Sequence, residues 1–170
     1  MNLFHTIVSI VAMISGGIIF FYTKGTSLHR KIGYTYVISM LLCLLTSFFI
    51  YDMFGGFGPF HILSIVSLVT ISIGIFFPVW GRSVNGWQIH HYFWMSYSYV
   101  GLWMAFMSHF MHLFPTRWPN FIVAFVAWGL PYILGSVVIF AQKNRMIHLY
   151  TSDGKTTETQ VGWLTIFHSF

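Results

Sequence analysis

Five long stretches free of Lys, Arg, Asp and Glu dominate the sequence and constrain what it can fold into. Each contains about 20 mostly apolar residues, the length at which a helix crosses the hydrocarbon core of a bilayer. They are Leu3–Tyr22, Ile32–Tyr51, Phe60–Trp80, His90–Phe114 and Pro119–Gln142. The short turns between them are rich in Gly, Pro, Ser and Thr, which favours antiparallel neighbours. We therefore predict an all-α bundle of five transmembrane helices over residues 1–142 and a tail over residues 143–170.

The composition excludes several classes of protein. Only 6% of the residues are charged, whereas 56% are hydrophobic. A soluble domain carries about 25% charged residues, so a soluble enzyme, a disordered chain and a nucleic-acid-binding module are all ruled out. The net charge of +5 reflects eight basic against three acidic residues and is not a nucleic-acid-binding face. The lipid bilayer is the expected surrounding of this chain.

The basic residues predict the orientation of the chain. Arg117, after the fourth span, is the only basic residue on one side of the membrane. The other seven follow the first, third and fifth spans and therefore lie on the other side: Lys24, Arg30, Lys31, Arg82, Lys143, Arg145 and Lys155. Cytoplasmic loops carry the excess of Lys and Arg in membrane proteins. We expect a plasma-membrane protein with its N-terminus outside and its C-terminal tail in the cytoplasm.

Histidine is the commonest side chain that titrates near neutral pH, with nine copies in the chain. Cys43 is the only cysteine, which excludes an internal disulfide, a Cys-based zinc site and an iron–sulfur cluster. Any metal or cofactor would therefore depend on imidazole. The candidates form two layers: His29, His90 and His91 at cytoplasmic ends of spans, and His61, His109 and His112 at outer ends. We interpret His5, His148 and His168 as interfacial residues without a specific role.

Two motifs resemble those of a known family. The first is K-G-x-x-x-H-R-x-x-G from Lys24 to Gly33, and the second is H-x-x-W-M from His91 to Met95. Together they resemble a family of small bacterial multi-pass membrane proteins with no assigned activity. The resemblance implies a helical membrane fold and draws attention to His29 and His91. The layout is also similar to cytochrome b561-like bundles, but as an architectural analogy only.

The leading hypothesis is a histidine-ligated cofactor, haem b first, in electron transfer or redox sensing, with a redox partner or a quinone. His29 and His91 would be the axial ligands, Gly33 and Ser98 would leave room for the ring, and Arg30 would bind its carboxylates. The distance between the two histidine layers weighs against haem. His91 and His109 are separated by about 27 Å along one helix, so haems bound at these layers would lie at the edges of a hydrocarbon core about 30 Å thick.

A second hypothesis is a zinc or copper site on the outer side, built from His61, His109, His112 and Asp52. Three imidazoles and a carboxylate form a suitable ligand set, and an open position would activate water. The case for an enzyme is weak, because no second carboxylate offers a general base and no G-x-S-x-G motif occurs.

The third hypothesis is a non-catalytic structural or lipid-interacting protein whose histidines are interfacial. Small residues recur on one face of the first and fourth spans, as expected of close helix packing. These are Ser9, Ala12 and Gly16, and Ser98, Gly101, Ala105 and Ser108. Pro131 predicts a kink in the fifth span, and Thr26 or Ser27 is expected to cap the second helix.

Overall fold

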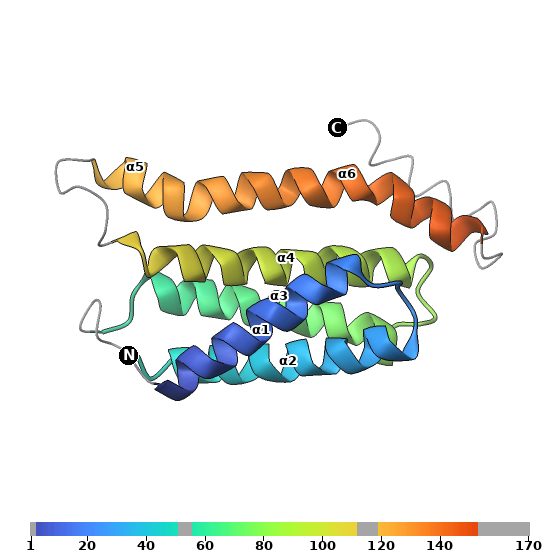
Figure 1. Ribbon diagram of the computed structural model, residues 1–170, viewed down its shortest axis with the longest axis horizontal. Coiled ribbons are helices and arrows are strands. Elements are labelled where there is room, and N and C mark those ends of the chain that lie inside the picture. The colour runs from blue at the N-terminus through green and yellow to red at the C-terminus, as the bar shows by residue number, and fades with distance from the viewer. Residues whose placement is uncertain (1–2, 51–55, 112–118, 153–170) are drawn as a thin grey trace.

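The computed structural model describes residues 3–50, 56–111 and 119–152, and over these residues the protein is helical with no strand (Figure 1). The elements are α1 (Leu3–Phe21), α2 (Ser27–Ser47), α3 (Pro59–Val79), α4 (Trp87–Ser108), α5 (Asn120–Ala124), the π-helix η2 (Phe125–Gly129) and α6 (Leu130–Ser152). The last three follow one another without a break and form a single rod. The predicted all-α class is confirmed, and each of the five predicted spans corresponds to one helix or to this rod.

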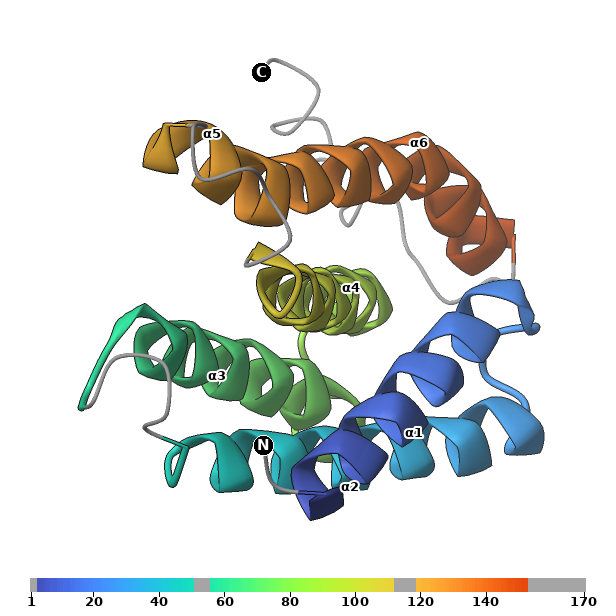
Figure 2. The same cartoon turned by 60° about the vertical axis from the view of Figure 1, so that its left-hand side comes forward.

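Helices α1 to α4 form a four-helix bundle, and the rod packs outside it. The closest packing joins α1 to α2 and α3 to α4, while α2–α3 and α1–α4 contacts complete the ring. Helices α2 and α4 therefore face each other across the bundle. The rod contacts α4 along η2 and α6, as the view in Figure 2 shows.

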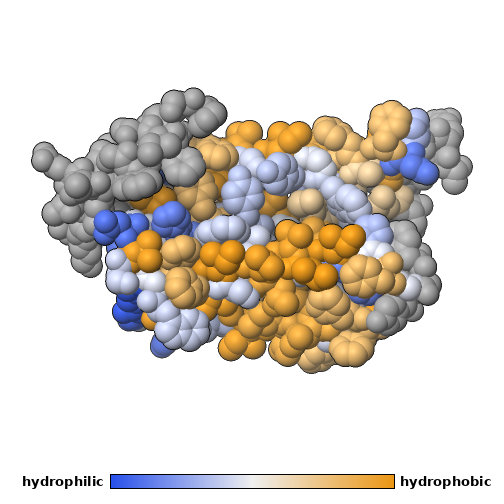
Figure 3. Space-filling model, turned by 180° about the vertical axis from the view of Figure 1, so that it is seen from behind, coloured by the Kyte–Doolittle hydropathy of each residue, from blue (hydrophilic) through white to orange (hydrophobic). Residues whose placement is uncertain are grey.

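The surface has the distribution expected of a protein in a bilayer. Figure 3 shows hydrophobic residues across the middle of one face and hydrophilic residues towards its two ends. Large apolar side chains are exposed along the helices, among them Ile14, Val66 and Val137, which are 59%, 53% and 61% exposed. In water such a surface would aggregate, whereas in lipid it needs no covering.

Three helical segments are long and apolar enough to cross a membrane by length and composition: Leu3–Phe21, Pro59–Val79 and Asn120–Ile147. The other two long helices, α2 and α4, begin with polar residues such as His29, Arg30 and His91, which lower their mean hydropathy. Other polar residues of these two helices, Ser39, Ser96 and Ser98, are buried in the bundle. Several helices of this chain are thus apolar enough for a membrane, as the sequence predicted.

Helix boundaries differ from the predicted spans where caps decide them. Helix α2 begins at Ser27, five residues before the predicted span, because the Thr26 hydroxyl accepts a hydrogen bond from the His29 N–H at 3.1 Å. This confirms the predicted cap. Helix α6 continues to Ser152, ten residues beyond the predicted end of the fifth span. The expected hairpin around Asp153 and the surface segment Trp163–Phe170 lie outside the described residues.

The proline of the fifth span follows a local widening of the helix. In η2 the Leu130 N–H bonds the carbonyl of Phe125, five residues earlier. Pro131 has no N–H, so the helical bond to the residue four positions earlier is missing. The π-turn just before Pro131 accommodates this missing hydrogen bond, and the helix continues beyond the proline.

Candidate functional site

Two groups of histidines occupy opposite ends of the bundle. We call the basic end the one that carries the α1–α2 and α3–α4 connections and the C-terminal part of α6. It holds all six described Lys and Arg residues: Lys24, Arg30, Lys31, Arg82, Lys143 and Arg145. His29, His90 and His91 lie at this end, in the first turns of α2 and α4. His5, His61 and His109 lie at the opposite end.

His91 is held in one orientation by the neighbouring helix. Its Nδ1 lies 2.7 Å from the carbonyl oxygen of Gly74 on α3. A carbonyl only accepts, so Nδ1 carries the proton and Nε2 keeps its lone pair. This is the arrangement by which proteins orient metal-ligating histidines. Gly74 leaves room for close packing of α3 against α4, since a Cβ there would lie 2.6 Å from the Met95 sulfur and force that side chain to shift.

His29 and His91 both lie at the basic end, on helices α2 and α4 that face each other across the bundle. His29 lies in the first turn of α2, ahead of the predicted span. Burial first, then the charge of Lys24, then that of His91, lowers the pKa of His29 to about 4. His29 is therefore neutral at pH 7, as a ligand must be. Its Nδ1 is buried and has no hydrogen-bond partner among the described residues. The structure thus places the two motif histidines at the same end of the bundle, where the charge of His91 acts on His29.

The other residues predicted around this pair have different surroundings. Arg30 is exposed beside His29, and the space next to Gly33 is open, since a Cβ there would meet no atom within 4 Å. Ser98 is fully buried and its hydroxyl lies 2.8 Å from that of Tyr36. Tyr36 therefore fills the volume beside Ser98 that was expected to receive a ring.

At the opposite end, the predicted metal ligands His61 and His109 make different hydrogen bonds through Nδ1. His61 is 4% exposed, and its Nδ1 accepts the Gly58 N–H at 3.2 Å, so the neutral ring carries its proton on Nε2. His109 is exposed and its Nδ1 lies 3.0 Å from the Ala105 carbonyl of its own helix. Asp52 and His112 lie outside the described residues. Within the described ranges, no three His, Cys, Asp or Glu residues are grouped closely enough to hold a metal ion.

The sequence interpretation missed that His5 is buried and joins α1 to α2 by a hydrogen bond. This residue was expected to be interfacial, but it is only 8% exposed and its Nδ1 lies 2.8 Å from the Thr46 hydroxyl on α2. Thr46 also lies 2.8 Å from the Leu42 carbonyl, to which it donates, so His5 is the donor to Thr46. The signal was available, because His5 continues the face of small residues through Ser9 and Ala12 that packs into the bundle.

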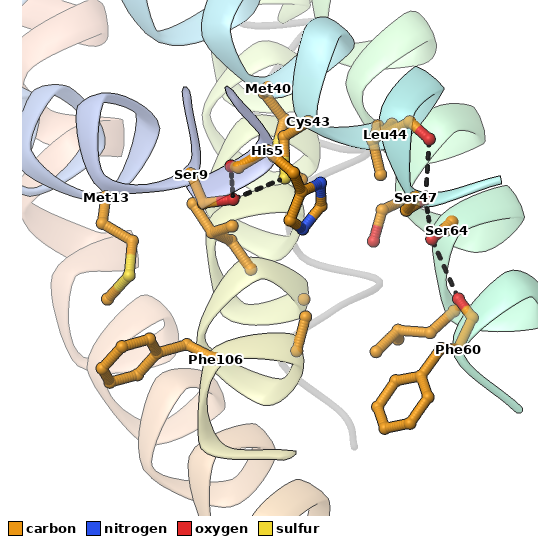
Figure 4. Close-up of a pocket in the computed structure, with 15 residues that line it drawn as sticks. His5, Ser9, Met13, Met40, Cys43, Leu44, Ser47, Phe60, Ser64 and Phe106 are labelled. Atoms are coloured by element: carbon orange, nitrogen blue, oxygen red, sulfur yellow. Dashed lines mark hydrogen bonds between the residues drawn. The ribbon is translucent and has the colours of Figure 1, made fainter. Parts of the chain in front are cut away.

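A cavity of about 100 Å³ lies among α1 to α4 near His5. Its wall includes polar groups from three helices, and Figure 4 shows two of their contacts: Ser9 to Cys43 at 3.1 Å and Ser47 to Ser64 at 2.8 Å. The volume suits about three water molecules and is far too small for a porphyrin. The opposite end therefore favours solvation of polar groups over a large cofactor.

Comparison with known proteins identifies the family of the chain. A family model described as "Predicted membrane protein (DUF2306)" matches residues 2–141, which include both motif stretches. No curated protein and no solved structure gives a significant match. Because the family model covers most of the sequence and the structure is a bundle of apolar helices, the chain belongs to the DUF2306 family of predicted membrane proteins.

Proposed function

We propose that this membrane protein binds a histidine-ligated cofactor, haem b in the first place, between His29 and His91 and uses it in electron transfer or redox sensing. The observation that carries the proposal is the bond from His91 Nδ1 to the Gly74 carbonyl. It orients the ring and leaves Nε2 available as a ligand.

Three further features of the basic end support the same site. His29 is neutral at pH 7 and its Nδ1 is buried without a partner among the described residues. The space beside Gly33 is open on the same helix. Arg30, next to His29, supplies a cation for the carboxylates of a haem. The group itself would supply the one-electron chemistry, and the chain would position it and set its potential through these neighbours.

The test is the absorption spectrum of the full-length protein, purified after expression with excess haem. A Soret band and about one haem per chain are expected, consistent with a single ligand pair. His91→Ala and His29→Ala should each lose the band or change it from a bis-imidazole form. His90→Ala is the matched control, because His90 is the adjacent residue, is exposed and stacks on Phe77 at 5.0 Å. No Soret band in the wild type, or equal haem in all variants, would overturn the proposal.

The zinc or copper hypothesis for the opposite end is addressed by metal analysis of the same sample. It predicts stoichiometric metal that is lost in a His109→Ala, His112→Ala variant. The orientation of His61, whose Nδ1 accepts a backbone N–H, weighs against its taking part through Nε2. If neither haem nor metal is found, the structural or lipid-interacting alternative is the one that the data favour.

A further inference from the structure

The basic end carries more positive charge than the chain can balance. Seven of the eight basic residues belong to this end by sequence, and of the acidic residues only Asp153 and Glu158 follow α6. Even if both carboxylates paired there, five positive charges would remain. An excess of basic residues on one side explains the orientation of the chain in the membrane. It does not require the basic residues on that side to lie close to one another.

Two of these cations, Lys24 and Arg145, belong to elements that are far apart in sequence but lie side by side at this end (Figures 1 and 2). Lys24 lies in the α1–α2 connection, beside Gly25, whose φ of 80° turns the chain. Arg145 lies near the C-terminal end of α6. Figures 1 and 2 both show this end of α6 beside the α1–α2 connection. Burial, and then the charge of Arg145, lower the pKa of Lys24, in keeping with this placement of the two elements.

The position of Lys24 is set by the helix that precedes it, α1. Its Nζ donates to the Ile19 carbonyl at the end of α1 and lies 5.8 Å from the centre of the Phe20 ring. A cation at this place complements the negative end of the helix dipole. These contacts explain the position of the Lys24 ammonium group. They do not explain why the element that carries a second cation, Arg145, lies beside it.

We propose that the corner formed by Lys24, Arg145 and the first turn of α2 binds the phosphodiester headgroup of an anionic phospholipid. A phosphate between the two side chains would turn a repulsive pair into two charge-assisted hydrogen bonds. The first turn of α2, whose His29 N–H is already bonded to the Thr26 hydroxyl, adds the positive end of a helix dipole. Phe21 and Leu28, which are 93% and 42% exposed, offer apolar contacts to the acyl chains next to this corner.

The test is native mass spectrometry of the full-length, haem-free protein with phosphatidylglycerol, and with phosphatidylcholine as the zwitterionic comparison. We expect phosphatidylglycerol to remain bound, and its apparent affinity to fall about tenfold in a Lys24→Gln, Arg145→Gln variant. Arg82→Gln removes the same kind of charge at the same end and should change the affinity less than about twofold. Arg82 is a suitable control because, like Lys24, it contacts a backbone carbonyl, that of Pro78 at 2.6 Å, and an aromatic ring, that of Trp87, but it lies in the α3–α4 connection outside the proposed corner.

Three outcomes would overturn the proposal. Equal retention of the two lipids would show that the headgroup charge is not recognised. An equal loss in Arg82→Gln would show a diffuse charge effect, and inorganic phosphate binding as tightly as the lipid would show a site for free anions. Lys24→Arg should keep the binding, which separates loss of the site from damage to the end of α1. The site does not depend on the haem proposal, since lipid retention is measured without haem.

Discussion

The chemistry open to each histidine of this protein depends on which ring nitrogen its neighbours occupy. His91 donates from Nδ1 to a carbonyl on α3, whereas His61 accepts an N–H at the same atom. The first ring offers an Nε2 lone pair and the second offers an Nε2 proton. These opposite states follow from single backbone groups, so two histidines that look equivalent in the sequence suit different tasks.

The lowered pKa of His29 predicts a pH-dependent stability. The ordinary value of 6.5 applies to the unfolded chain, and the folded value is about 4. Between these values the unfolded chain binds the additional proton, so the stabilisation is complete above about pH 6.5 and is lost as the pH falls towards 4. With solvent screening taken into account, we expect a loss of about 1 kcal/mol.

Denaturation of the haem-free protein in detergent, near pH 7 and near pH 5, measures this effect. His29→Gln should reduce the difference in stability between the two pH values. An identical pH dependence in the wild type and in His29→Gln would show that the protonation of His29 is not linked to folding.

The hydrogen bond between Tyr36 and Ser98 predicts a cost for a very small change. Tyr36 is 2% exposed and its hydroxyl donates to Ser98, whose own proton bonds the Met95 carbonyl at 2.8 Å. Ser98→Ala should destabilise the protein by about 1–3 kcal/mol, because a buried hydroxyl is left without a partner. Adding Tyr36→Phe should recover part of that loss in a double-mutant cycle. Strictly additive effects of the two changes would contradict this account.

At the scale of the helix, contact between elements depends on particular small residues. A Cβ on Gly16 would lie 2.5 Å from the Tyr99 ring, which is held in place by a bond from its hydroxyl to the Met13 carbonyl at 3.0 Å. Gly16→Ala should therefore destabilise the α1–α4 contact by about 1–3 kcal/mol. Gly33→Ala is the matched control, since no atom lies within 4 Å and alanine favours a helix by up to about 1 kcal/mol. Thermal unfolding in detergent measures both, and equal effects would show that the Gly16 contact is not restrictive.

The helical elements were largely predictable because local rules decide them. The apolar stretches, the Thr26 cap and the irregularity near Pro131 all follow from neighbours within a few residues. The end of α6 was not predictable in this way. Polar residues after Gln142 suggested a tail, but the helix continues, and its buried residues Ile139 and Met146 still pack in the core with Tyr92 and Val100 of α4.

At the scale of the whole molecule, the charge asymmetry predicts the topology. In a Cys43→Ala background, Asn120→Cys should react with a membrane-impermeant maleimide added to intact cells, because Asn120 lies at the end opposite the basic residues. Ser83→Cys, in the α3–α4 connection, should react only after the cells are opened. Both residues are exposed in the structure, so accessibility within the protein does not limit the reaction. Labelling of Ser83→Cys but not of Asn120→Cys in intact cells would show the opposite orientation.

The sequence alone determined that this chain is a helical membrane protein, because hydrophobic length and scarce charge are properties of composition and of local order. It also selected His29 and His91 through the two motifs. Only the tertiary structure decided that these two histidines lie on helices that face each other across the bundle, that Tyr36 fills the space beside Ser98 and that His5 is buried. Those facts depend on how helices rotate and pack against one another, and side chains from distant segments set that rotation.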